Sequence, residues 1–90
     1  MKLIFSRPAV NDLVRLRKFI AENNPEAAQR VAGALVESIH KLIEAPRIGR
    51  PVVDIPGEVR ELVVGKYVVR YEVRKTVLYI LRIWHGKENR

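Results

Sequence analysis

The spacing of apolar residues changes once along this chain, on either side of a proline-rich segment. Before the segment, apolar residues recur at intervals of three and four, the period of a helix with one buried face. After it, they alternate with polar residues, as in a half-buried strand. The segment itself, residues 45–57, holds three of the five prolines and two of the five glycines, which is typical of a loop. The pattern therefore predicts a helical first half and a stranded second half.

The 90 residues are too few to divide into two cores, so we expect one domain over residues 1–90. The predicted class is α+β, with the order β-α-α-β-β-β. The sheet is expected to be antiparallel, with the N-terminal helical hairpin packed on one face and the first strand at an edge or between others. The predicted elements are a strand over 2–6, the helical hairpin over about 7–45, a three-stranded meander over about 58–84 and a short basic tail over 85–90.

Proline and cap residues delimit the predicted hairpin. Pro8 and Pro25 suit the first turn of a helix, where a missing N–H has no intrahelical partner. Asn24 is a good N-cap for the second helix, and Pro46 ends it.

Two tight turns set the predicted register of the meander. Two-residue loops at residues 65–66 and 74–75 place Glu61 opposite Arg70, an attractive pair, and Tyr71 opposite Leu78. Both faces of the resulting sheet are substantially apolar, and one hairpin covers only one of them. We therefore expect a protein partner over the sheet or along the helices. The alternative is that the loop 45–57 and the C-terminal tail cover this surface.

Strand alternation also predicts a mixed aromatic and basic face. It places Arg60 and Arg82 beside Tyr67, Tyr71 and Trp84. Guanidinium groups among aromatic rings suit a phosphate with a stacked base, or an anionic peptide, so Tyr71 and Trp84 are predicted target contacts. The alternative is that the arginines extend to solvent or meet carboxylates.

Composition excludes several classes of function. The chain has 17 basic against 10 acidic residues, a net charge of +7 spread over both halves, which suits nucleic acid or an acidic protein. With no cysteine there is no disulfide or thiolate zinc site, and His40 and His85 are too few for a histidine-rich metal centre. We expect no cofactor and no metal, and His40 is predicted to be a surface residue beside the apolar stripe of the second helix. The start has only three consecutive apolar residues before a charge, so we expect no signal peptide, no membrane span and a cytoplasmic protein.

The N-terminal strand and five further segments form a pattern over nearly the whole chain. The segments are Asn24-Pro25-Glu26-Ala27-Ala28, the loop 46–51, Arg60-Glu61-Leu62, residues 67–73, and residues 77–86 ending in Ile83-Trp84-His85-Gly86. Together they resemble one family, the RelE/ParE superfamily of bacterial toxins.

The resemblance implies the toxin half of a type II toxin–antitoxin module. Such a toxin is silenced by a cognate acidic antitoxin, whose C-terminal segment folds as it binds, in a toxin–antitoxin hetero-oligomer. ParE-like members poison DNA gyrase, whereas RelE-like members are ribosome-dependent endoribonucleases that cleave mRNA. The chain is therefore an enzyme only if it is RelE-like, and a homologue that binds its antitoxin and nothing else is a third alternative.

The resemblance also assigns residues. Arg60, Arg82 and His85 fall at or near the catalytic positions of RelE-like nucleases, with His85 as acid or base. Gly86 stands where many of these nucleases have a tyrosine, and Arg47 and Arg50 match the family's basic loop pair only loosely. The His85-Gly86-Lys87 ending is typical of ParE-like sequences, so gyrase is the favoured target. Predicted target contacts through charge are Arg47, Arg50 and Lys87.

Overall fold

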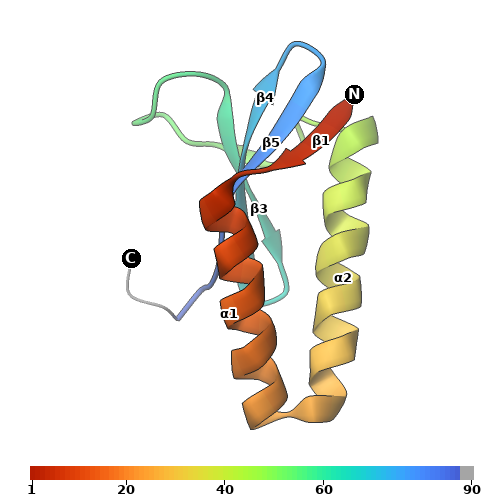
Figure 1. Ribbon diagram of the computed structural model, residues 1–90. Helices are drawn as coiled ribbons and strands as arrows, with labels where there is room; N and C mark the ends of the chain where they lie inside the picture. The colour runs from red at the N-terminus through yellow and green to blue at the C-terminus, as the bar shows by residue number, and fades with distance from the viewer. Residues whose placement is uncertain (88–90) are drawn as a thin grey trace.

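A five-stranded sheet lies against a helical hairpin in the computed structural model of this chain, which describes residues 1–87 (Figure 1). The strand order is β1-β5-β4-β3-β2. The predicted α+β fold is confirmed, with a short strand β2 added inside the loop. The elements are β1 (Lys2–Phe5), α1 (Arg7–Asn23), α2 (Pro25–Glu44), β2 (Arg50–Pro51), β3 (Val59–Val64), β4 (Tyr67–Arg74) and β5 (Val77–His85). The predicted tail 85–90 is corrected at its start, since His85 ends β5, and its last three residues lie outside the described part.

A side-chain cap begins each helix, at Asn24 as the sequence predicts and at Ser6 for the first helix. The Ser6 hydroxyl accepts the N–H of Ala9 at 3.1 Å, and the Asn24 side chain accepts the N–H of Ala27 at 3.2 Å. A proline follows each cap in the first turn. Each cap satisfies an N–H that the helix itself leaves without a partner, so both boundaries are determined locally.

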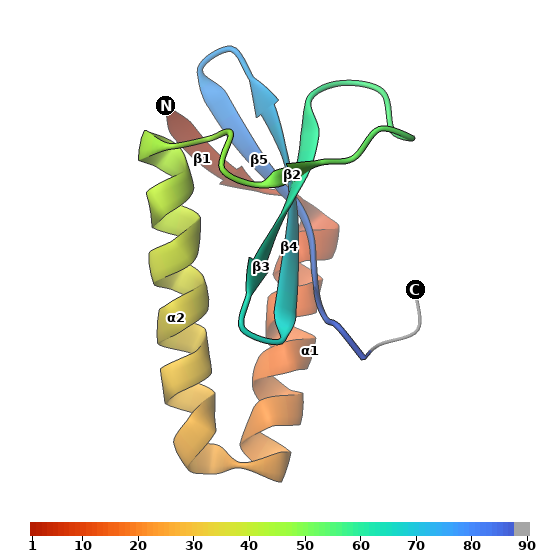
Figure 2. The same cartoon turned by 180° about the vertical axis from the view of Figure 1, so that it is seen from behind.

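The hydrophobic core lies between the hairpin and one face of the sheet. Seen from behind, β3 and β4 lie in front of α1 with α2 to one side, and no helix covers this second face (Figure 2). Full burial of each large apolar side chain contributes about 1.5–3 kcal/mol. The buried core residues are Ala9, Leu16, Ile20, Leu35, Ile39, Leu42, Val69, Tyr71, Leu78, Ile80 and Ile83.

The first strand lies at an edge and runs parallel to its neighbour, so the sheet is mixed rather than antiparallel throughout. β1 pairs only with the first part of β5, from Lys2 opposite Val77 to Phe5 opposite Ile80. Residues 81–85 of β5 therefore extend beyond β1, and their outer edge lies next to α1.

The β3–β4 register agrees with the prediction, whereas the β4–β5 register does not. Glu61 lies opposite Arg70 as expected. In the second turn Lys75 takes a left-handed conformation, with φ of 38°, and the strands close at Arg74 opposite Val77. Tyr71 consequently lies opposite Ile80 instead of Leu78. This shift of two residues by itself keeps residues 77–80 on their predicted faces, because the period of a strand is two.

A bulge in β5 reverses the predicted faces near the end of the strand. Tyr71 pairs with Ile80 and Arg70 with Arg82, which leaves Leu81 as an extra residue. An extra residue changes the face of everything that follows it. The prediction that Arg82 and Trp84 share a face with Tyr71 is therefore wrong.

Candidate functional site

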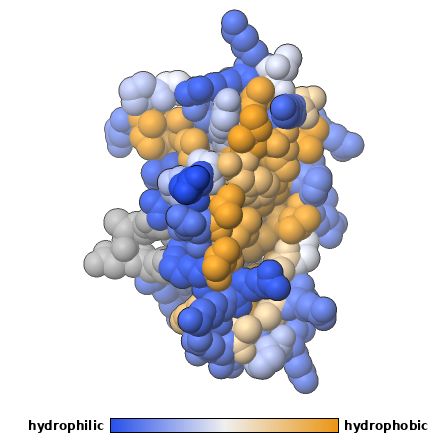
Figure 3. All heavy atoms as spheres, in the orientation of Figure 1, coloured by the Kyte–Doolittle hydropathy of each residue, from blue (hydrophilic) through white to orange (hydrophobic). Residues whose placement is uncertain are grey.

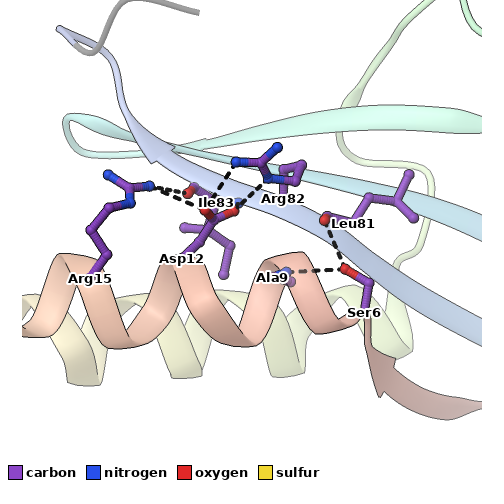
Figure 4. Close-up of polar contacts among 7 residues, drawn as sticks. All are labelled: Ser6, Ala9, Asp12, Arg15, Leu81, Arg82 and Ile83. Carbon is purple, nitrogen blue, oxygen red and sulfur yellow. Dashed lines mark hydrogen bonds and ion pairs between the residues drawn. The ribbon is translucent and has the colours of Figure 1, made fainter.

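Three polar side chains from the start of the chain close the outer edge of β5. The Asp12 carboxylate accepts the backbone N–H of Ile83 at 2.8 Å, and Arg15 donates to the Ile83 carbonyl at 3.4 Å. The Ser6 hydroxyl donates to the carbonyl of Leu81 at 2.8 Å (Figure 4). We call Ser6, Asp12 and Arg15 the edge seam. It supplies the hydrogen bonds that a further strand would otherwise make, since buried backbone groups need partners.

Asp12 is a buried carboxylate, only 4% exposed, held by two arginines. Arg82 reaches it from β5 with Nε at 2.8 Å and Nη2 at 3.1 Å, and Arg15 reaches it from α1 at 3.2 Å (Figure 4). Burial raises the pKa of Asp12, but the hydrogen bonds from Arg82, Ile83 and Arg15 outweigh it, so the pKa lies below its usual value.

The sequence prediction missed the role of Asp12. It follows Ala9 by three positions and precedes Leu16 by four, so it lies on the buried face of α1. An acidic residue on an apolar helix face was the available signal. Its partner Arg82 was predicted to contact a phosphate or an anionic peptide, and the alternative, that it meets a carboxylate, is what the structure shows.

Arg60 is engaged within the loop between α2 and β3. Its Nη1 donates to the carbonyl oxygens of Gly49 at 2.8 Å and Arg47 at 3.2 Å, and its Nε contacts Glu58 at 3.3 Å. Arg47 pairs with the same carboxylate at 2.8 Å. Desolvation raises the pKa of Glu58. The hydrogen bonds from Arg47 and Arg60 lower it by more, so the pKa lies below its ordinary value.

The Tyr71 side chain forms hydrogen bonds to the same loop from within the core. It is fully buried, its hydroxyl donates to the Pro46 carbonyl at 2.8 Å, and it accepts the N–H of Gly49 at 2.9 Å. Burial raises the pKa of Tyr71 despite the bond from Gly49. The assignment of Tyr71 as a target contact is thereby corrected, since none of its surface reaches solvent.

Trp84 lies on the face of the sheet that no helix covers. The Arg70 guanidinium lies 5.1 Å from the centre of its ring and pairs with Glu61 at 2.6 Å. Among the large hydrophobic residues of this face, Val63 is exposed. Arg74 stacks in the same way on Tyr79, so basic side chains cover part of the surface expected to be apolar.

His85 ends β5 and lies opposite Tyr67, the first residue of β4. Its ring packs edge-on against Tyr67, with centroids 5.0 Å apart. Its Nδ1 accepts the backbone N–H of Lys87 at 3.0 Å. A neutral His85 therefore carries its proton on Nε2, which makes that nitrogen a donor.

The three predicted nuclease residues do not converge. Arg60 lies opposite Tyr71 and His85 lies opposite Tyr67, so their register positions are about 13 Å apart along β4. Arg82 is paired with Asp12 on the other side of β5. The remaining predicted contacts lie on separate surfaces, with Arg47 and Arg50 exposed on the loop and Lys87 exposed beyond β5.

An apolar strip runs along the hairpin. Val10, Val14 and Val36 are 45–64% exposed, and a groove of about 200 Å³ separates the two helices beside them. Apolar surface forms a band in the central and upper part of this side of the molecule, with hydrophilic residues on its flanks (Figure 3). We call these three valines the hairpin strip.

Along the described residues, no helix is long and apolar enough to cross a membrane.

Comparison with known proteins identifies relatives over nearly the whole chain. "Toxin RelE1" of Caulobacter vibrioides is 34% identical over 90 residues, covering 98% of this chain and 96% of the relative. "Toxin RelE2" of the same organism is 36% identical over 86 residues and covers 94% of each chain.

A solved structure has the same fold. A chain of the "Chromosomal ParDE TA system from P. aeruginosa" aligns with a TM-score of 0.80 and 28% identity, over 94% of this chain and 95% of that one. The model of the family described as the ParE toxin of the type II toxin–antitoxin system parDE matches residues 3–90. Membership of such a family implies a cognate antitoxin. The chain therefore belongs to the ParE family, within the RelE/ParE superfamily, and is the toxin of a type II toxin–antitoxin system.

Proposed function

We propose that this toxin arrests growth by binding DNA gyrase and trapping its cleaved-DNA state, without catalysing a reaction itself. The observation that carries the proposal is the separation of Arg60, Arg82 and His85, with both arginines held in ion pairs inside the protein. The match to the ParE family supports the same choice.

Cleavage of RNA beside a 2′-hydroxyl needs a base, an acid and cations around one phosphate. Arg60 would have to leave Glu58 and two carbonyl oxygens to reach a phosphate, and Arg82 would have to leave a buried carboxylate. Such sites depend on preorganised donors that point at the substrate. The guanidinium groups of Arg60 and Arg82 instead point at acceptor groups of the protein itself.

The test is a supercoiling assay with purified toxin and gyrase. We expect loss of supercoiling and accumulation of cleaved DNA as toxin is added. Gyrase that supercoils normally at a large excess of folded toxin contradicts the proposal.

A second candidate is cleavage of mRNA on the ribosome, favoured by the names of the relatives RelE1 and RelE2. It predicts codon-positioned cuts in a translation extract. The cuts would be lost in His85→Ala and Arg82→Ala and kept in His40→Ala, the other histidine of the chain. Cutting that persists in the first two variants removes both residues from the mechanism.

We propose further that the cognate antitoxin is acidic and folds over the hairpin strip in a hetero-oligomer. A net charge of +7 favours an acidic partner, and Val10, Val14 and Val36 offer apolar surface to it. We also propose that the toxin acts in the cytoplasm, since either proposed target, gyrase or the ribosome, is found there.

A further inference from the structure

Exposed apolar side chains gather in the loop 45–57, which lies outside the core and outside the groove between the helices. Its segment between β2 and β3 extends beyond the sheet on the side away from α2 (Figure 1, Figure 2). Val53 is 89% exposed and Ile48 is 55% exposed. A single exposed valine is ordinary, but several exposed apolar residues in one loop indicate a contact surface. The exposed apolar residues of this loop are Ile48, Pro51, Val53 and Pro56.

Two side chains of the sheet hold the loop backbone on both sides of Ile48. The Tyr71 hydroxyl donates to the Pro46 carbonyl at 2.8 Å and accepts the N–H of Gly49 at 2.9 Å. Arg60 donates to the Gly49 carbonyl at 2.8 Å. Ile48 is therefore presented to solvent between two anchored residues.

The backbone beside Val53 is anchored as well. The N–H of Val52 donates to the Val59 carbonyl at 2.8 Å, which fixes the loop to the start of β3. Pro51 and Pro56 restrict the backbone on either side of Val53. A loop that is already ordered loses less conformational entropy when it binds, so this one is suited to an interface.

The charges of the loop favour an acidic partner. Arg47 and Arg50 are both exposed, and Asp54 is the only acidic residue within 45–57. Arg47 pairs with Glu58, yet its side chain remains 65% exposed. The net charge of +7 on the whole chain adds to the attraction.

Aliphatic side chains on an ordered loop suit a protein rather than a nucleic acid or a membrane. Nucleic-acid strands stack their bases on aromatic rings, and residues 45–57 include none. Peripheral proteins commonly bind membranes through an amphipathic helix, and this loop contains no helix. Protein interfaces combine buried apolar anchors with a polar rim, which is the composition found here.

We infer that the loop 45–57 is the surface through which the toxin contacts an acidic region of its protein target. Val53 and Ile48 are the apolar anchors, and Arg47 and Arg50 pair with carboxylates around them. The inference rests on the proposed function, which makes gyrase the target. The loop shares no residue with the hairpin strip, so binding of target and antitoxin should respond to different substitutions.

The experiment compares Val53→Ser with Val63→Ser, which removes an exposed valine of β3 outside the loop. Biolayer interferometry measures the affinity of the complete toxin for gyrase loaded on DNA, and a supercoiling assay measures inhibition. Val53→Ser should weaken binding about tenfold and raise the inhibitory concentration by the same factor, because an apolar anchor is lost. Val63→Ser should change both by less than about twofold. The affinity of Val53→Ser for the antitoxin should stay within about twofold of that of the parent toxin.

The charges are tested by a second matched pair. Arg50→Gln should weaken binding to gyrase about threefold and make it less sensitive to salt. Arg30→Gln removes the same charge from an exposed position of α2 and should change binding less than about twofold. Circular dichroism and thermal unfolding check that every variant is folded.

The inference is overturned, and the proposed function retained, if Val53→Ser binds and inhibits gyrase as well as the parent toxin. It is also overturned if Val63→Ser loses as much affinity as Val53→Ser, or if Arg30→Gln loses as much as Arg50→Gln. Binding to the same DNA alone, or to phosphatidylglycerol vesicles, that falls tenfold in Val53→Ser would assign the loop to nucleic acid or membrane and overturn the inference.

Growth arrest at limiting inducer separates the inference from the proposed function if the parent toxin leaves gyrase unaffected. Arrest that is lost in Val53→Ser and kept in Val63→Ser retains the loop as the contact surface for another protein and rejects gyrase. Equal arrest by both variants, or no arrest by the parent toxin, rejects both.

Discussion

The carboxylate of Asp12 accepts the backbone N–H of Ile83 at 2.8 Å across 71 residues of sequence. Ile83 is fully buried, so its N–H has no access to water. A buried N–H without a partner costs about 1–3 kcal/mol, and a buried carboxylate needs the arginines that neutralise it. This one side chain therefore joins α1 to the end of β5, the segment that carries Trp84 and His85.

Asp12→Ala should lower the free energy of unfolding by about 1–3 kcal/mol, because it leaves the buried N–H of Ile83 without an acceptor and removes the ion pair with Arg82. Asp12→Asn, which keeps an acceptor oxygen, should cost less. Urea unfolding followed by circular dichroism measures both. Asp54→Asn, in the exposed loop, is the control and should stay within about 0.5 kcal/mol of the parent protein. Equal stability of Asp12→Ala and Asp54→Asn would show that the edge seam does not stabilise the fold.

The stabilisation by Asp12 should depend on pH. Its pKa in the folded protein is below the unfolded value of 3.8, so the unfolded state binds the proton more readily. The contribution is therefore complete above pH 3.8 and declines as the pH falls through the lower folded pKa. Unfolding curves at a series of acidic pH values should show that the difference in free energy of unfolding between the parent protein and Asp12→Asn becomes smaller as the pH falls. A difference in free energy of unfolding that does not change with pH contradicts the prediction that Asp12 is ionised in the folded protein.

Tyr71→Phe should destabilise the fold by about 1–3 kcal/mol, because the buried N–H of Gly49 loses its acceptor. Tyr79→Phe is the matched control, since the ring of Tyr79 contacts Arg74 at the sheet surface. Thermal unfolding of the two variants gives the comparison. If both variants unfold at the same temperature, the hydroxyl of Tyr71 does not stabilise the loop.

Gly49→Ala should also be destabilising, by about 1–3 kcal/mol. A Cβ at this position would overlap the Tyr71 hydroxyl and lie 2.9 Å from the Glu61 carbonyl oxygen. Gly33→Ala serves as control, since a Cβ there meets nothing within 4 Å, and alanine should raise helix stability. Opposite signs of the two effects in urea unfolding are the expected result.

Arg70→Gln should lower stability by about 1 kcal/mol, because it removes a short ion pair with Glu61 and the cation–π contact with Trp84. Arg74→Gln makes a matched comparison, with a similar pair of contacts but a side chain 62% exposed against 32%. It should cost less than about 0.5 kcal/mol. The fluorescence of Trp84, the only tryptophan, should change in the first variant and not in the second.

Val14→Lys should weaken binding of the cognate antitoxin about tenfold or more, since it removes apolar area from the hairpin strip. Val53→Lys adds the same charge at a valine that is 89% exposed in the loop and should leave the affinity within about twofold. Isothermal titration calorimetry with purified antitoxin compares them. Similar affinities for both variants would place the antitoxin elsewhere on the toxin.

The helices and the β3–β4 hairpin follow from local sequence. Ser6 and Asn24 cap their helices because each side chain reaches an N–H three residues ahead, and Gly65, with φ of 60°, begins the tight turn between β3 and β4. The opposition of Glu61 and Arg70 then follows from the turn. The separation into a helical half and a stranded half rests on the same local periods.

Only the tertiary structure decided the end of β5 and the surroundings of the predicted site residues. The bulge at Leu81 leaves no local sign, because β5 alternates equally well with or without it, and it moves Arg82 and Trp84 away from Tyr71. Asp12 meets Ile83 because β1 stops at Phe5 and leaves the edge of β5 to α1. Local sequence determines hydrogen bonds within a few residues, whereas the partner of a buried carboxylate depends on which distant elements pack beside it.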